Sequence, residues 1–159
     1  MREEFDVRMT ASALYDYNMY QTYSSVAGIV ATVFGALLLI VYAATRQPAF
    51  AFGGIVVILY SPFALYFNAK KQVKLNPTFR NPIHYTLDDE GVTVSQGDEE
   101  LTVAWENMLK ARSTEQSIFL YTSKNSAWIF PKKDLGEKKY DIIELISTHM
   151  PPSKVNIKQ

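Results

Sequence analysis

Two long stretches without a charged side chain dominate the first half of the sequence. No Asp, Glu, Lys or Arg lies between Asp16 and Arg46, or between Arg46 and Lys70. Each stretch can supply the roughly 20 apolar residues that an α-helix needs to cross about 30 Å of hydrocarbon. The polar turn between them, residues 45–48, is short. The pattern therefore predicts a transmembrane helical hairpin over residues 23–69, with spans at about 24–45 and 48–69.

The remaining composition narrows the classes of function. The chain has 159 residues, a formal net charge of zero and no cysteine, so disulfides, thiolate chemistry and cysteine-based zinc sites are excluded. From residue 81 onward there are 12 acidic and 9 basic residues. This acidic excess argues against nucleic-acid binding, which needs a basic surface.

The segment before the hairpin, residues 1–22, predicts a strand and an interfacial helix. Residues 5–9 alternate apolar and charged side chains, which is the period of a half-buried strand. Thr10 is a plausible N-cap for a tyrosine-rich helix over residues 11–25, which we expect to lead directly into the first span. A cleaved signal peptide is the alternative, but the leader is long and acidic and a second span follows.

Small side chains recur along the first span at intervals of four. Ser24, Gly28, Thr32 and Ala36 share one helix face, and Gly53 is the corresponding small residue of the second span. In lipid, small residues let two helix backbones approach closely. The stripe predicts packing of one span on the other within the hairpin, with a dimerisation face as the alternative.

A basic connector, residues 70–82, follows the second span. Lys70, Lys71 and Lys74 precede Asp88, which is the first acidic residue after the second span. Positive flanks lie on the cytoplasmic side of membrane proteins, so both chain termini are predicted to be cytoplasmic. The same lysines could contact anionic lipid headgroups, although topology alone explains them.

The pattern changes to short strands from residue 83. Alternation and turn residues predict strands over residues 83–88, 92–96, 100–106, 108–113, 117–122 and 127–130. A helix starting between residues 134 and 137 and ending at 150 follows, and the tail 151–159 is predicted to be flexible. With the strand at residues 5–9, this is an α+β chain whose hairpin is inserted after the first strand of a small antiparallel β-barrel or sandwich. Seven strands and a C-terminal helix are the outline of a pleckstrin-homology-like (PH-like) domain, here over residues 83–150.

The chain resembles the YcxB-like family of small bacterial membrane proteins. The resemblance rests on the order of its features: the first strand, the tyrosine-rich helix and the two spans, and then residues 85–92, 103–106, 120–121 and 129–133. It implies a membrane protein with a cytoplasmic PH-like domain, and it implies no reaction.

Residues that could carry chemistry are few. His84 and His149 lack the spacing of metal ligands, and Trp105 and Trp128 lie on strand patterns typical of core residues. Lys132 and Lys133 could meet lipid headgroups or an acidic partner, or could simply be a solvated helix entrance. No phosphate loop or nucleophile elbow appears, so we expect no enzyme, no cofactor and no metal site.

The sequence therefore predicts a multi-pass protein of the cell membrane that acts as a non-enzymatic interaction or regulatory module. Its expected partners are the lipid bilayer, anionic headgroups, a second copy of itself or another membrane protein. The alternative is a subunit of a small oligomeric transporter or channel, which would require polar groups within the spans.

Overall fold

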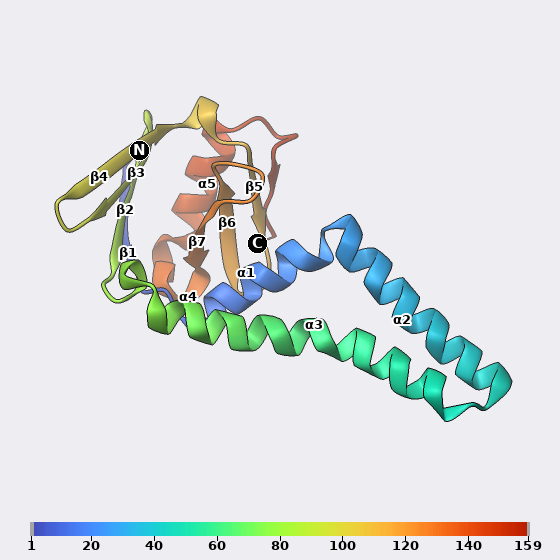
Figure 1. Cartoon of the computed structure of the whole chain (residues 1–159). Coiled ribbons are helices and arrows are strands. Elements are labelled where there is room, and N and C mark those ends of the chain that lie inside the picture. Colours follow the sequence, from blue (N-terminus) through green and yellow to red (C-terminus); the bar gives the residue numbers. More distant parts are fainter. Residues whose placement is uncertain (1, 159) are drawn as a thin grey trace.

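The first strand and the second strand of the chain pair with each other across an inserted helical segment. The computed structural model describes residues 2–158; Met1 and Gln159, which fall in the predicted N-terminal segment and tail, lie outside the described residues. Figure 1 shows a body of strands from which two long helices project as a hairpin. The chain is thus α+β, with two long apolar helices, antiparallel sheets and a C-terminal helix.

Two four-stranded sheets form the body. The first has the order β1-β2-β3-β4 and is antiparallel throughout. Its strands are β1 (Glu3–Val7), β2 (Ile83–Leu87), β3 (Gly91–Gln96) and β4 (Glu99–Ala104). The second has the order β7-β6-β5-β8. Its strands are β5 (Lys110–Ser113), β6 (Ser117–Tyr121), β7 (Ala127–Pro131) and β8 (Val155–Asn156). The six strands predicted after the hairpin are all present, with ends that differ by at most two residues.

The main core lies between the two sheets and the C-terminal helix α5 (Lys139–His149). A short helix α4 (Lys132–Leu135) and a 3₁₀ turn η3 (Gly136–Lys138) lead into α5. Ile142, Leu145 and Ile146 recur at helical spacing and are buried, so α5 presents one apolar face to the sheets. In Figure 1, α5 stands between the two sheets and fills the space where they diverge.

The helix before the hairpin does not run directly into the first long helix. Helix α1 (Ala11–Tyr23) begins after the predicted N-cap Thr10, whose side chain accepts a hydrogen bond from the Ala13 N–H. Ser24 is the C-cap of α1, and Ser25 is the N-cap of α2 (Val26–Thr45). The Ser25 hydroxyl oxygen accepts a hydrogen bond from the Gly28 N–H. The helix predicted before the hairpin is therefore present and leads into the first long helix across a two-residue break, because the two serines supply a C-cap and a new N-cap.

The second long helix extends further than the predicted span. Helix α3 (Pro48–Leu75) ends only at Asn76, whose side chain caps the following 3₁₀ turn η1 (Pro77–Phe79). Lys70, Lys71 and Lys74 of the predicted basic connector therefore lie on the last turns of α3. Proline at residue 77 explains the stop, since it disfavours helix at the residue before it.

Helices α2 and α3 approach each other closely at two glycines, Gly35 and Gly54. A Cβ built on Gly54 would lie 2.9 Å from the Gly35 carbonyl oxygen, whereas one on Gly53 would lie 3.6 Å from the nearest atom, in Leu38. Gly28 packs instead against the carbonyl of Thr22 at the end of α1.

The remaining small residues of the predicted stripe lie outside this contact. Ser24 precedes α2, and Thr32 and Ala36 are exposed. The spacing of small residues thus pointed to the right helices, but the contact lies at Gly35, beside the predicted stripe of α2, and at Gly54 rather than Gly53 of α3.

The C-terminal tail is partly ordered by strand pairing. Strand β8 pairs in parallel with β5, and the Ala111 N–H donates to the Lys154 carbonyl at 2.9 Å. Val155 and Ile157 pack against the main core. The predicted flexible tail therefore contains a strand that completes the second sheet.

We predict that Gly54→Ala is less stable than Gly53→Ala by about 1–3 kcal/mol, because the new methyl group would overlap the Gly35 backbone. Both changes bring the same gain in helix propensity, about 1 kcal/mol, so the difference isolates the contact. Unfolding in mixed detergent micelles, followed by circular dichroism, measures it. Equal stability of the two variants would show that α2 and α3 do not approach at Gly54.

Candidate functional site

Strand β6 is buried on both of its faces. All five of its residues are buried, as expected for a strand that is covered on both faces. Ile118 and Leu120 point into the main core, whereas Phe119 and Tyr121 belong to a second cluster on the outer face of the sheet. The outer face therefore has its own cover, which α1 and α3 provide.

We call this second cluster the joint. Its buried members come from α1 and the residue before its cap, from α3 and from the second sheet: Met9, Ala13, Leu14, Tyr17, Ala69, Phe119, Tyr121 and Ile129. The rings of Tyr17 and Phe119 pack edge to face, with their centroids 5.4 Å apart. The Tyr17 hydroxyl donates to the Asn125 carbonyl at 3.2 Å. The Tyr121 hydroxyl donates to Gln21 Oε1 at 3.1 Å. Burial raises the pKa of both tyrosines.

An apolar groove opens beside the joint. Its inner hollow, of about 330 Å³, is lined by Met9, Leu14, Tyr17, Thr78, Phe79, Ile83, Tyr85, Val94, Gln96, Asn125, Ser126, Ala127, Trp128 and Ile129. An outer hollow shares Val94, Gln96 and Trp128 and adds residues of the β3–β4 hairpin, with Asp98, Glu99 and Glu100. The inner lining holds no charged side chain, so the groove offers apolar contact and a few hydrogen bonds rather than acid–base chemistry.

The joint and the groove share residues. Met9, Leu14, Tyr17 and Ile129 belong to both. Any movement of α1 on the second sheet would therefore change the shape of the inner hollow. This coupling is the feature of the site that sequence reasoning missed; the available signal was the unbroken apolar run of β6, which predicts cover on both faces.

The predicted basic contact residues fall on two separate elements. Lys70, Lys71 and Lys74 are exposed on α3, where the Lys70 ammonium lies 4.7 Å from the centre of the Tyr66 ring. Lys132 and Lys133 begin α4 and line a different hollow beside the start of α1. The fold thus places the two groups in different surroundings.

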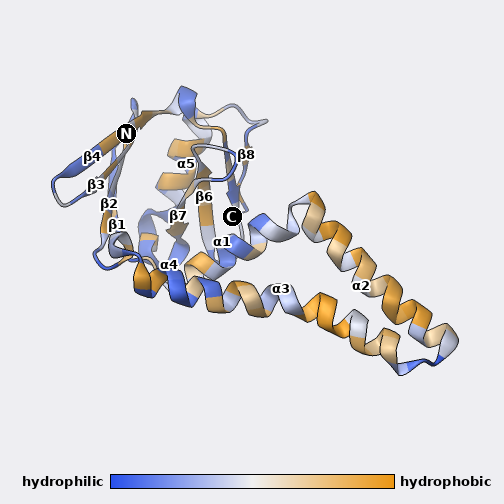
Figure 2. Ribbon diagram, viewed as in Figure 1, coloured by the Kyte–Doolittle hydropathy of each residue, from blue (hydrophilic) through white to orange (hydrophobic). Residues whose placement is uncertain are grey.

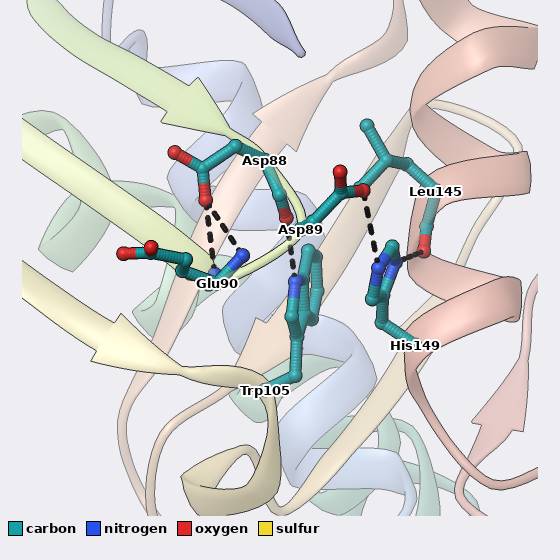
Figure 3. Close-up of polar contacts among 7 residues, drawn as sticks. Asp88, Asp89, Glu90, Trp105, Leu145 and His149 are labelled. Atoms are coloured by element: carbon teal, nitrogen blue, oxygen red, sulfur yellow. Dashed lines mark hydrogen bonds and ion pairs between the residues drawn. The ribbon is translucent and has the colours of Figure 1, made fainter. Parts of the chain in front are cut away.

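The histidines and the acidic turn have structural partners. Figure 3 shows His149 beneath the β2–β3 turn, with Nδ1 donating to the Leu145 carbonyl at 2.9 Å and Nε2 3.4 Å from Asp89 Oδ1. Its ring stacks on Trp105, whose indole N–H donates to the Asp88 carbonyl at 2.7 Å. These contacts fasten the turn to the end of α5.

The other histidine, His84, lies on β2 opposite Asp6 of β1, and their side chains are 2.8 Å apart. Within residues 2–158, no three side chains from His, Cys, Asp and Glu are grouped so as to hold a metal ion. Both histidines therefore connect elements of the fold.

We predict that Tyr85→Phe weakens the loss of stability at alkaline pH. Tyr85 lines the groove, and burial raises the pKa of its hydroxyl above the ordinary value of 10.0. The contribution of the protonated Tyr85 hydroxyl to the free energy of unfolding is complete below a pH of about 10. It is lost as the pH rises further, because the unfolded chain releases the tyrosine proton first. The free energy of unfolding, measured with denaturant at several pH values, should fall less steeply above pH 10 in Tyr85→Phe than in the wild type. An identical slope would show that the hydroxyl is hydrated in the folded state.

Comparison with known proteins identifies one family. No curated protein and no solved structure matches the chain. Residues 87–146, which run from the end of β2 into α5, match the family model described as YcxB-like protein. Over these residues the match agrees with the resemblance to the YcxB-like family that the sequence shows.

Proposed function

We propose that the protein is a membrane-anchored, non-enzymatic interaction module whose transmembrane hairpin is coupled to a PH-like β domain. The observation that carries the proposal is the joint, which holds α1 and the end of α3 on the second sheet and also forms part of the groove wall. A partner bound in the groove and a change in the hairpin would act on the same residues.

The surface of α2 and α3 supports insertion into a bilayer. Both helices are long and apolar enough to cross a membrane, and Figure 2 shows hydrophobic residues along most of α2 and much of α3. Large side chains such as Val26, Phe52 and Phe67 are more than 60% exposed. A contiguous apolar surface of this kind is untenable in water, and its exposure distinguishes these helices from the buried core helix of a soluble protein.

Helix lengths suggest how the hairpin sits. The 20 residues of α2 span about 30 Å, which matches the hydrocarbon core. Helix α3, with 28 residues, is longer than the hydrocarbon core is thick. The excess turns would carry Lys70, Lys71 and Lys74 beyond the hydrocarbon, with Tyr66 at the interface, and the basic residues favour a cytoplasmic location for this end and for both termini.

The pairing of β1 argues against a cleaved signal peptide. Cleavage after α2 would remove β1 from the first sheet and α1 from the joint. We therefore infer that the hairpin stays attached.

The β domain has features of the PH-like arrangement. Four strands in one sheet, three further antiparallel strands in a second and a C-terminal helix between them follow that outline, and β8 is an addition. The transporter alternative gains no support from the spans, because the Thr32 and Thr45 hydroxyls donate to carbonyls of their own helix, at Gly28 and Val41.

We predict that single cysteines at Gln47 and Lys124 label from opposite sides of the membrane. Gln47 is exposed in the α2–α3 turn and Lys124 in the β6–β7 turn, and the chain has no native cysteine. A membrane-impermeant maleimide applied to spheroplasts and to inverted vesicles measures accessibility. The Lys124 variant should react only in inverted vesicles, and the Gln47 variant only in spheroplasts.

Extraction provides the control for this experiment. The protein should remain in the membrane pellet after a sodium carbonate wash. Labelling of both positions from one side, or release by carbonate, would contradict the proposed insertion.

A further inference from the structure

A buried hydroxyl without a partner marks a second site, away from the groove. Ser117 at the start of β6 is fully buried, and its Oγ makes no hydrogen bond within the part of the chain that the structure describes. No other buried side-chain nitrogen or oxygen atom of residues 2–158 lacks a partner. Such a group is costly to leave unsatisfied, so its presence calls for an explanation.

The side chain of Ser117 points toward α1. Side chains alternate along a strand, so Ser117 lies on the same face of β6 as Phe119, which packs against Tyr17 and Tyr20 of α1. Ser117 lines a hollow of about 260 Å³ together with Thr10, Ser12 and Ala13. The hydroxyl therefore faces the first turn of α1.

That first turn offers unused backbone donors. The N–H groups of Ala13 and Leu14 donate to the side chain and the carbonyl of Thr10. The N–H groups of Ala11 and Ser12 donate to no acceptor among the described residues. The first N–H groups of a helix and its dipole together make a positive end that suits an anion, and α1 has 13 residues.

Two lysines complete the hollow. Lys132 and Lys133 lie on its rim; one donor of the Lys132 ammonium reaches the Lys158 carbonyl at 3.2 Å, which leaves its other hydrogens available. The exposed Lys133 forms no ion pair among residues 2–158. Glu115 is the one carboxylate of the lining and is exposed. The balance of the lining is thus positive, with donors arranged on several sides.

We propose that this hollow binds a phosphate group, as inorganic phosphate or as a phosphate monoester. Phosphate oxygens are strong acceptors, and they would meet the backbone donors of α1, the hydroxyl of Ser117 and the two ammonium groups. The Ser12 hydroxyl donates to Gln116 Oε1 at 3.3 Å and is not counted among these donors. The inference goes beyond the proposed function, since it uses α1, the second sheet and α4 and holds whether or not the hairpin crosses a membrane.

Calorimetric titration of inorganic phosphate into the full-length protein tests the site. The protein is held in phosphatidylcholine nanodiscs in phosphate-free buffer. We expect saturable binding that Ser117→Ala and Lys133→Gln each weaken by about 3- to 10-fold, because each removes one hydrogen-bond donor. Glu115→Gln should tighten it by about 2- to 5-fold through loss of a nearby like charge. Lys124→Gln, an exposed lysine at the other end of β6, is the matched control and should bind as the wild type. No saturable binding, or equal affinity for Ser117→Ala and the wild type, would overturn the proposal.

A stability measurement separates binding from folding. In phosphate-free buffer, Ser117→Ala should melt at the same temperature as the wild type or higher, because it loses an unsatisfied hydroxyl. Added phosphate should raise the melting temperature of the wild type more than that of Ser117→Ala. A lower melting temperature of Ser117→Ala without phosphate would mean that water already satisfies the hydroxyl, and this would contradict the assignment.

The source of the phosphate is distinguished by lipid. Nanodiscs containing phosphatidic acid present a monoester headgroup, and those containing phosphatidylglycerol present a diester. If added phosphate binds more weakly in the phosphatidic acid nanodiscs but not in the phosphatidylglycerol nanodiscs, a lipid headgroup occupies the site. Equal binding in the two anionic bilayers identifies a soluble phosphate compound.

Discussion

The pairing of β1 with β2 is the interaction on which the rest of the structure depends. The two strands are in register from Glu3 opposite Leu87 to Val7 opposite Ile83, although α1, α2 and α3 all lie between them in the sequence. A strand of five residues has no stability alone, so β1 is held by the sheet and by burial of Phe5 and Val7 in the core. Both ends of the hairpin are consequently fixed to one sheet.

The joint extends this constraint from the chain ends to the helices themselves. Because Phe119 and Tyr121 turn outward from β6, the second sheet would expose aromatic surface if α1 left it. Tyr17 connects the joint with the groove, and Thr10 at the other end of the same helix lines the hollow beside Ser117. One helix thus borders two candidate binding sites, and its position on the sheet affects both.

Much of the architecture was predictable, since it follows from local patterns. The absence of charge gave the two long helices, alternation gave the strands to within two residues, and Thr10 capped α1 as expected. The predictions that failed concern how helices and strands face one another in space. The spacing of small residues does not say which face of α3 meets α2, so Gly54 was missed beside Gly53. Likewise, β8 pairs through its backbone with a distant strand, which leaves no periodic signal in two residues. The site residues were the least predictable, because Ser117 is an ordinary strand residue until the fold buries its hydroxyl beside a helix end.

The central claim is that the hairpin and the β domain form one structural unit through the joint. Hydrogen exchange of the intact protein in nanodiscs tests it when a bulky side chain is placed at Ala69, which is fully buried in the joint on α3. The account predicts that Ala69→Trp speeds exchange at β6 and β7, about 50 residues away in sequence, whereas Phe67→Trp, on the exposed side of the same helix, does not. Faster exchange confined to α3 in the Ala69→Trp variant would contradict the claim and leave the hairpin as a simple anchor.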